Sequence, residues 1–310
     1  MSAIITEKFR QHNADQFVES FTETSNSTYY LFVGKATAYT SSTTGGSDST
    51  PPAPADAPGD TEFYAWDSML AAKNVTSSDV SYAIPRRNWA NGDTYDMYDD
   101  DISSSSTTTS GASNLYDSTF YFMTSDYRVY KVLDNNAGAA YSGAEPTSES
   151  TSPFELGGYV LKYMYAITTS EAAKYLTSDF IPVSNDSTIT AAATDGGIES
   201  LKITAGTGYT NGTYYAAIYG DGTSAGTSSG GIVRITVSGG VIQSFGLTAG
   251  SDTTLHAGGA AYTFGTVNLA SGYTFSDSGL SSASAIGGSG GAIEVVISPK
   301  NGHGYSAIKE

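Results

Sequence analysis

The chain has 310 residues and a formal net charge of −17 at pH 7, because 31 acidic residues outnumber 14 lysines and arginines. This charge argues against nucleic-acid binding, since affinity for phosphates comes mostly from Lys and Arg. The absence of cysteine excludes disulfide bonds and thiolate metal sites, and only three histidines, far apart in the sequence, disfavour chemistry that needs a histidine cluster.

Composition also indicates the fold class. The 35 glycines and 23 tyrosines, with abundant Ser and Thr, are typical of many short strands and tight turns. Charged residues make up only 15% of the chain, which is low for a helix-rich surface. We therefore expect a mainly β protein. No apolar run is long enough to span a bilayer, and the N-terminus lacks the pattern of a secretory signal, so we expect no membrane contact and assembly where the chain is made.

The first predicted elements are a helix and a strand. Aromatic residues recur near one helical face over Phe9–Phe21, with Asn13 or Asp15 available as the N-cap. The aromatic and branched run Thr28–Gly34 predicts a buried strand. Residues 40–60 lose all periodicity and contain clustered prolines, which predicts an exposed, partly extended loop.

A short helix is expected next, capped by Asp60 or Thr61 and running through Trp66, Met69 and Leu70.

The segment Ile84–Trp89 places two adjacent arginines beside one of the two tryptophans. Pro85 fixes its own φ, so the arginines emerge from a stiff loop or strand start. Planar guanidinium donors beside an indole are typical of protein contact surfaces, and we expect Arg86, Arg87 and Trp89 to lie at or beside a subunit interface. The alternative is that Trp89 is in the core. In either case we expect at least one arginine to pair with a carboxylate.

An acidic segment, Asn91–Asp101, follows this motif. Its spacing lacks the alternate oxygen ligands, central glycine and terminal glutamate of a calcium-binding loop. A bound cation is therefore disfavoured, and a solvated loop or a partner for the two arginines is expected. No metal site is predicted.

Two strong strands, Ser118–Met123 and Tyr127–Leu133, flank a short polar turn and predict a hairpin. Leu156–Ile167 predicts a long strand, in which Gly157 and Gly158 mark a bulge or a close backbone approach. Two further short elements are expected after it: a helix at Ser170–Leu176 and a strand at Phe180–Val183.

From about residue 187 the chain has little charge, many glycines and clear self-similarity. Gly196–Gly206 recurs as Gly240–Gly250, and each copy leads into a glycine-rich turn and another β-like run. Two copies should combine into one small β-domain at 187–290 with few contacts to the rest. The sequence around Gly220–Gly222 does not lead into a helix as a phosphate-binding loop does.

The last predicted strand is Ala292–Ile297, which alternates apolar and polar residues. We expect it to pair with a strand of the first 186 residues, because an unpaired strand invites aggregation. Glu294 is expected on the solvated face.

Enzyme chemistry finds no support in these residues. No Gly-x-Ser-x-Gly elbow is present at a strand-to-helix turn, and no pair of acids is placed for glycoside hydrolysis. We therefore predict no catalytic residues and no cofactor. The tyrosine excess permits an alternative, a carbohydrate-binding module built on the Gly/Tyr-rich repeats.

Five short strings stand out along the chain: Ile4–Arg10, Tyr30–Lys35, Ile84–Trp89, Tyr127–Asp134 and Gly157–Tyr165. They occur in the order and rough spacing seen in a baseplate wedge subunit of T-even-type contractile-tailed bacteriophages, which the chain resembles over about residues 1–185. The repeats have no counterpart in the best-known members. The family pattern also continues well beyond residues 302–304, so this subunit is expected to be either shortened or part of a longer product.

The resemblance implies a non-enzymatic structural protein of the virion, mainly β with sandwich-like domains. It further implies homodimers and contacts with other baseplate wedge proteins, in a tail assembled in the host cytoplasm. The expected organisation is a family-like region at 1–186 with an N-terminal helix, a Gly-rich β-repeat insertion at 187–290, and a returning strand with a C-terminal loop at 291–310.

Overall fold

The protein is mainly β and has only a few short helices, as predicted. The structure is a computed structural model, and it describes residues 7–23, 27–34, 38–40, 46–51, 66, 69–222, 230–269 and 286–298. The chain divides into two compact units, Met1–Tyr82 and Ala83–Glu310. No helix in the described part of the chain has the length and apolarity that a membrane span needs.

Within its described residues, the first unit contains an α-helix, a short 3-10 helix and a two-stranded antiparallel sheet. Its elements are α1 (Glu7–Glu19), β1 (Tyr29–Gly34), β2 (Met69–Val75) and a 3-10 helix at Ser77–Asp79. The α1 helix is joined to β1 by an aromatic cluster, in which the rings of Phe17 and Tyr29 both contact Phe21 at centroid distances of 5.1 and 4.7 Å. The predicted helix is therefore present. Its N-cap prediction is wrong, because Asn13 and Asp15 lie inside α1.

The strand predicted at 28–34 is confirmed as β1, but the expectation that it is buried is wrong. Its only strand partner in the described part of the chain is β2, and the aromatic contacts to the α1 segment reach only Tyr29 at its start. Four consecutive apolar side chains, Tyr30 to Val33, are between 44% and 65% exposed. The second predicted helix is also wrong at its C-terminal end, because Met69 and Leu70 belong to β2. Its predicted caps, Asp60 and Thr61, lie outside the described residues.

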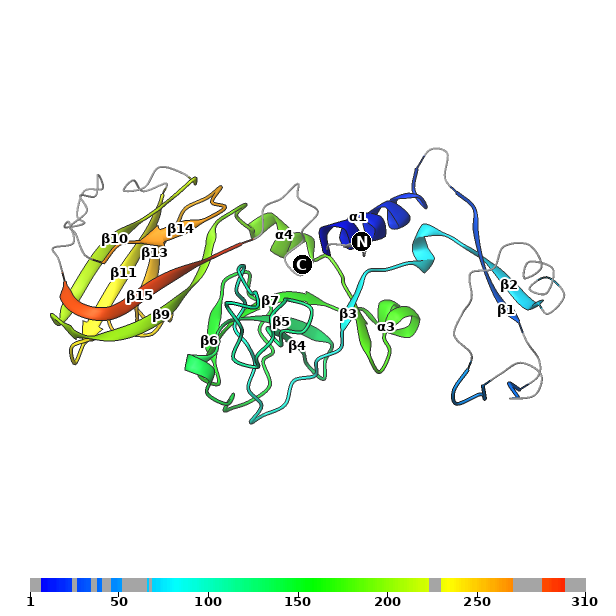
Figure 1. The fold of residues 1–310 in the computed structure, drawn as a ribbon, viewed down its shortest axis with the longest axis horizontal. Helices are drawn as coiled ribbons and strands as arrows, with labels where there is room; N and C mark the ends of the chain where they lie inside the picture. Colours follow the sequence, from blue (N-terminus) through cyan, green and yellow to red (C-terminus); the bar gives the residue numbers. More distant parts are fainter. Residues whose placement is uncertain are drawn as a thin grey trace, which may run out of the picture. The chain divides into compact units, whose positions relative to one another are not determined.

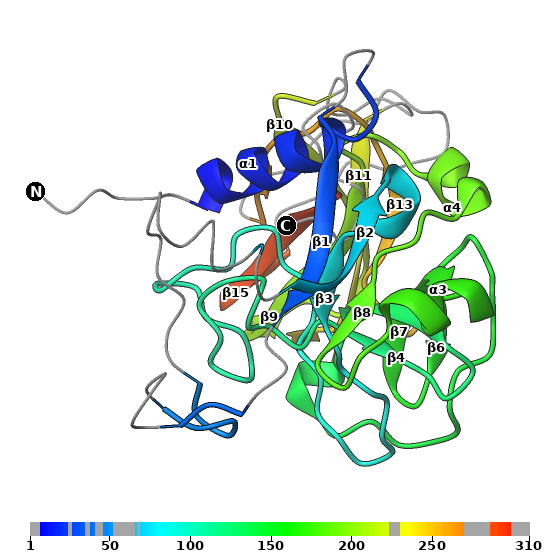
Figure 2. The same ribbon diagram turned by 90° about the vertical axis from the view of Figure 1, so that its right-hand side faces the viewer.

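The second unit begins with the aromatic region, residues 83–186. Its elements are β3 (Ala83–Pro85), β4 (Tyr121–Met123), β5 (Arg128–Asp134), β6 (Phe154–Leu156), β7 (Tyr159–Ala166), α3 (Thr169–Tyr175) and β8 (Phe180–Pro182), with a 3-10 helix at Asn136–Gly138. The strands form a four-stranded antiparallel sheet in the order β4-β5-β7-β6 and a separate β3-β8 pair. The predicted hairpin is confirmed by the β4-β5 pairing. Figure 2 shows α3 beside β8.

The long strand predicted at 156–167 is instead a hairpin of β6 and β7. Leu156 pairs with Tyr159, and the two glycines between them have φ values of 65° and 86°. Positive φ at both central positions is what a tight two-residue hairpin turn requires. Gly157 and Gly158 therefore form a turn and not a bulge, whereas the alternative expectation of a close approach is met at Gly157, where an added β-carbon would stand 2.5 Å from the Tyr141 ring.

The repeat region, residues 187–298, forms a second sheet, drawn with β9 to β15 in Figure 1. Its elements are α4 (Ser187–Ala192), β9 (Ile198–Tyr209), β10 (Gly212–Gly220), β11 (Gly231–Ser238), β12 (Val241–Ile242), β13 (Thr254–Gly258), β14 (Gly265–Val267) and β15 (Gly287–Ile297). The sheet has seven strands in the order β12-β11-β10-β14-β15-β9, and β13 also pairs with β11.

This sheet nearly closes into a barrel. The strands β9 and β12 stand at opposite ends of the strand order, yet the Tyr209 N–H donates to the Gly240 carbonyl at 3.0 Å. The first repeat copy supplies β9 and the second begins at β12, so the two copies meet at the seam of the barrel. The expectation that both copies build one small β-structure agrees with this sheet.

The predicted strand at 292–297 is present as the end of β15, but its predicted neighbour is wrong. It pairs with β9 over most of its length and with β14 at Glu294, both in the repeat region. The physical reason is that β9 offers a long edge whose alternation matches that of β15. The C-terminal loop at 299–310 lies outside the described residues, as does most of the proline-rich loop at 40–60.

Three apolar clusters hold the second unit together. Two of them lie mainly in the aromatic region, one around Tyr121 and Ile181 and the other around Phe122 and Tyr130. The third fills the repeat sheet, around Leu201. The clusters cross the expected boundary at 186/187, because side chains of each region join a cluster of the other. Few contacts were expected there, and that expectation is wrong; the boundary itself stays a prediction.

Candidate protein interface

The Arg86-Arg87-Asn88-Trp89 loop leaves β3 and runs beside β4. Trp89 N–H donates to the Met123 carbonyl at 2.8 Å, and the Trp89 ring meets the Tyr141 ring edge-on at 5.9 Å. Arg86, Arg87 and Trp89 are all half-buried. The stiff segment predicted from Pro85 is therefore a short strand followed by a loop that is fastened to its neighbours.

Both arginines bind backbone carbonyls, and among the described residues neither forms an ion pair with a carboxylate, so the expected pairing is not found in that part of the chain. Arg86 donates to the Thr177 carbonyl at 2.9 Å. Arg87 donates to the carbonyls of Tyr116 and Asp117 at 3.0 and 2.9 Å, and lies 5.7 Å from the centre of the Tyr121 ring. A guanidinium has five donors in a rigid plane, which allows it to bind two adjacent carbonyls at once.

Three carboxylates of the acidic loop, those of Asp96, Asp99 and Asp100, have partners other than these arginines. Asp96 accepts hydrogen bonds from the backbone N–H groups of Ser110 and Thr119 at 2.7 and 2.9 Å, and from the Ser110 and Ser118 hydroxyls. Burial alone would raise the pKa of Asp96, but these hydrogen bonds outweigh it and hold the pKa below its usual range. Asp96 thus fixes the loop against the start of the β4 segment.

The Arg86–Trp89 loop also contains two buried nitrogen donors that make no hydrogen bond among the described residues. The Nε atom of Arg87 and the Nε1 atom of Trp89 are buried, and neither has a hydrogen-bond partner within the described ranges. Unsatisfied buried donors cost free energy, and each such group in a folded protein needs an explanation. The loop is therefore held in place by its hydrogen bonds, but two of its buried donor groups have no hydrogen-bond partner among the described residues.

A buried ionic triad joins the two regions of the second unit. Lys131 on β5 and Lys162 on β7 are cross-strand partners, and the Glu199 carboxylate on β9 receives both ammonium groups at 2.6 and 2.8 Å. The Lys131 side chain is 0% exposed and the Glu199 side chain 4%. The Lys131 ammonium also lies 3.3 Å from the centre of the Tyr98 ring. We call these three charged residues the ionic clasp.

The charges of the clasp shift each other's titration. Burial opposes ionisation of Glu199, but the two lysines outweigh it and lower the pKa of Glu199 to about 2. Burial lowers the pKa of Lys131 from its usual range, against the attraction of Glu199. The clasp therefore holds its carboxylate ionised down to strongly acidic pH.

A β-bulge aims Glu199 at the lysines. On β15, Val296 pairs with Ser200 and the next residue, Ile297, pairs with Ile198, so Glu199 has no cross-strand partner. An extra residue of this kind breaks the alternation of a strand and redirects its side chain.

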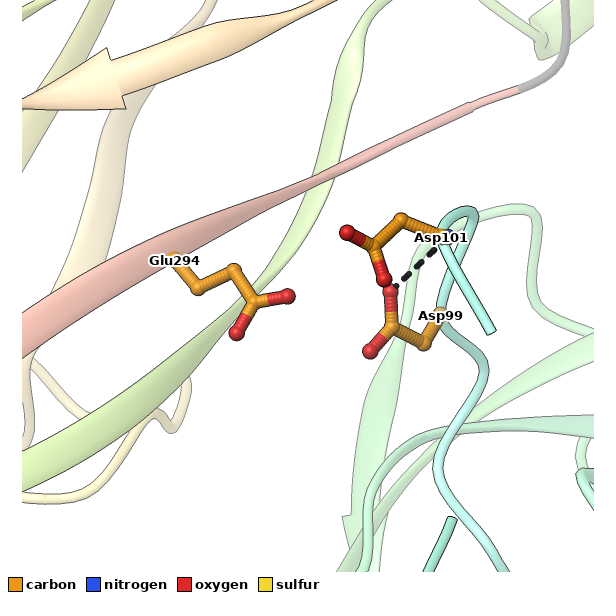
Figure 3. A group of neighbouring side chains, drawn as sticks. All are labelled: Asp99, Asp101 and Glu294. Carbon is orange, nitrogen blue, oxygen red and sulfur yellow. Dashed lines mark hydrogen bonds between the residues drawn. The ribbon is translucent and has the colours of Figure 1, made fainter. Parts of the chain in front are cut away.

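An acidic cluster lies beside the clasp. Carboxylate oxygens of Asp99, Asp101 and Glu294 lie within 4.8 Å of one another. Figure 3 shows Glu294 reaching from β15 towards the two aspartates of the loop. The Lys202 ammonium already lies 2.9 Å from Asp99 and 3.4 Å from Glu294, which neutralises part of the charge that would attract a cation. Glu294 is partly exposed, on the opposite face of β15 from Ile293, as its alternation predicted.

A cavity of about 270 Å³ opens next to this cluster. Its lining combines residues of the aromatic region with one lysine of the repeat region: Met97, Asp99, Thr107, Thr108, Thr109, Asn135, Ala137 and Lys202. Asn135 is committed to the fold, because its side chain donates to the Tyr95 carbonyl and accepts from the Gly138 N–H.

The first unit carries a run of large apolar side chains that are exposed among the described residues. We call it the apolar ribbon, and it comprises Tyr30, Leu31, Phe32 and Val33 on β1 with Leu70 on β2. The only charged side chain on these two strands is Lys73, which pairs with Asp79. An isolated two-stranded sheet is marginal in water, and an uncharged strand edge readily pairs with another chain.

Comparison with known proteins gives one family. The family model described as Phage-Gp8: Bacteriophage T4, Gp8 matches residues 3–145. That segment of the chain resembles Gp8. The matched residues make up a little under half of the chain and include both the apolar ribbon and the Arg86–Trp89 loop. The match supports a structural role of the T4 baseplate wedge type. No curated protein matches the chain.

Sequence reasoning located the Arg-Trp loop but missed the clasp and the apolar ribbon. Glu199 looked like any polar residue of a repeat, and only the bulge reveals its direction. Lys131 offered a signal, since it stands between Tyr130 and Val132 in a strand that is otherwise apolar from Val129 to Leu133. A lysine within such a run needs a buried partner.

Proposed function

We propose that the protein is a structural component of a phage tail baseplate wedge, and that it acts through contacts with other proteins and not through catalysis. The match of residues 3–145 to bacteriophage T4 Gp8 carries this proposal. The proposed location is the baseplate of a contractile tail in the virion, after assembly in the host cytoplasm.

We further propose that the protein forms a homodimer and also contacts other wedge proteins. The apolar ribbon supports such contacts, because four consecutive large side chains on β1 are at least 44% exposed. Burying them against another protein would remove a substantial apolar area from water, which is the main driving force of association. The net charge of −17 opposes non-specific association, so an uncharged patch is where specific contact costs least.

The Arg86-Arg87-Trp89 loop remains our proposed second contact surface. The loop is fixed by hydrogen bonds from both guanidiniums to backbone carbonyls, which lowers the entropy lost on binding. Half-buried Arg and Trp side chains are the types most enriched at the energetic centres of interfaces.

The test is reconstitution of the full chain with the other wedge proteins of the same phage. Sedimentation equilibrium of the protein alone should give twice the chain mass of 32.2 kDa. Co-expression should then yield a stable complex that contains the protein. If the protein is a monomer but still enters the complex, only the proposed homodimer is contradicted. If the protein never co-purifies with any wedge protein, the proposed function itself is contradicted.

A second candidate function, carbohydrate binding by the repeat region, has one observation in its favour. Tyr219 on β10 and Phe264 before β14 are 41% and 58% exposed. Tyr219 pairs with Thr266 of β14, and Phe264 directly precedes β14, so the two residues lie near the same end of the β10-β14 pair. Exposed aromatic faces of this kind can stack on sugar rings. A glycan array with the full chain, and with Phe264→Ser as control, tests this; absence of binding to any glycan would dismiss it.

A further inference from the structure

The ionic clasp is built from residues of both regions: two lysines of the aromatic region and one glutamate of the repeat region. Lys131 and Lys162 stand opposite each other on β5 and β7, and like charges in this position repel. Within the described residues, the only carboxylate that forms an ion pair with either of them is Glu199. The aromatic region therefore contains two neighbouring lysines, one fully buried, whose carboxylate partner comes from the repeat region.

Contacts on either side of the clasp restrain the same two regions. On one side, Lys202 pairs with Asp99, and the Ile297 N–H donates to the Asp100 carboxylate at 2.9 Å. On the other, the Leu247 N–H donates to the Glu155 carboxylate at 2.6 Å. These contacts come from different strands and loops of the repeat region, so a rotation about one of them breaks the others.

Apolar packing follows the same arrangement. Leu133 and Val160 of the aromatic region belong to the cluster inside the repeat sheet, and Val296 of β15 belongs to the cluster around Tyr121. Interdigitation of this kind leaves a small number of well-packed arrangements, because protein interiors are close-packed.

We propose that the ionic clasp locks the repeat region to the aromatic region in one orientation, so that residues 187–298 act as a rigid extension and not as a tethered module. Repeat insertions on flexible linkers sample many orientations, whereas this one is fixed by a charge that is buried only when the two regions are docked. The inference does not depend on whether the protein assembles in a baseplate.

The test measures the distance between the two regions by pulsed electron paramagnetic resonance on the full chain. The protein has no cysteine, so Ser152→Cys and Ser238→Cys, both at exposed positions in different regions, give two unique labels. The parent should show one narrow distance distribution. Glu199→Gln leaves both lysines without a carboxylate and should at least double the width of the distribution.

Two further variants complete the experiment. Glu149→Gln removes the exposed partner of Arg128 within the aromatic region and should leave the distribution unchanged. Lys162→Met keeps the Lys131–Glu199 pair and should broaden the distribution less than Glu199→Gln does. A broad distribution in the parent would overturn the proposal, and so would an unchanged one in folded Glu199→Gln. If Glu199→Gln does not fold, Lys162→Met decides, because an unchanged distribution in that variant would also overturn it.

Discussion

Gly157 lies directly against the ring of Tyr141, so that a β-carbon added at Gly157 would stand 2.5 Å from Cζ of Tyr141. The tyrosine is 1% exposed and its hydroxyl donates to the Ala144 carbonyl at 2.8 Å, so the ring has little room to move. The β6-β7 turn and the aromatic cluster therefore depend on the same missing side chain.

Replacement of Gly157 by Ala should destabilise the second unit by about 2–5 kcal/mol, since it combines the cost of positive φ with overpacking against a fixed ring. Gly92→Ala is the matched control, because Gly92 also has positive φ, at 91°, but no atom within 4 Å of the added β-carbon. It should cost only about 1–2 kcal/mol. Urea unfolding of both variants measures the difference; equal losses would contradict the steric role of Tyr141.

Removal of the clasp carboxylate by Glu199→Gln should cost about 3–5 kcal/mol of unfolding free energy, because it leaves a fully buried lysine without its partner. Glu149→Gln, which breaks an ion pair whose acidic side chain is 53% exposed, should cost less than about 1 kcal/mol. Thermal and urea unfolding of the two variants check this contrast. Similar small losses in both would mean that the buried pair contributes no more than an exposed one.

The low pKa of Glu199 predicts part of the response of the protein to acid. Its pKa in the folded protein is about 2, below the usual 4.5, so its ionisation stabilises the fold fully above pH 4.5 and progressively less as the pH falls towards 2. The contribution lost across this window is on the order of 3 kcal/mol. Stability measured between pH 6 and pH 2 should fall less steeply for Glu199→Gln than for the parent. Parallel curves would contradict the shifted pKa.

The apolar ribbon predicts a surface variant that assembles poorly but folds normally. Leu31→Thr with Val33→Thr places β-branched residues at both positions of β1 while removing apolar surface from two side chains that are 64% and 60% exposed. Stability should change by less than about 0.5 kcal/mol per site. The dissociation constant of the proposed dimer, measured by sedimentation equilibrium, should rise at least tenfold. Leu247→Thr, at an exposed leucine of the repeat region, is the control and should leave dissociation unchanged.

Local patterns in the sequence were sufficient for many elements but not for their environment. The hairpin of β4 and β5 and the helix α3 were predictable because their signals lie within a few residues. The exposure of β1 was not, because an apolar strand has the same sequence whether or not a second layer covers it. Gly157 and Gly158 were recognised as special, yet a turn and a bulge both use positive φ, and only the pairing of Leu156 with Tyr159 separates them.

Long-range relationships account for the remaining errors. The β15 strand pairs with β9, which ends more than seventy residues before β15 begins, and alternation alone cannot name a partner at that distance. The carboxylate partners expected for Arg86 and Arg87 were assigned by proximity in sequence, whereas Asp96 and Asp99 are held by the hydroxyls and the lysine that the fold brings to them. The clasp required a bulge, whose position depends on the register of two strands and not on either one.

The hydrogen bond between Tyr209 and Gly240 means that the two repeat copies together bring the ends of the sheet into contact. Each copy supplies one of the two strands that end the sheet, so deletion of a single copy would uncover a strand edge on the sheet that remains. Open edges of glycine-rich strands with few charges favour pairing between molecules. Natural variants of this chain should therefore gain or lose the copies two at a time.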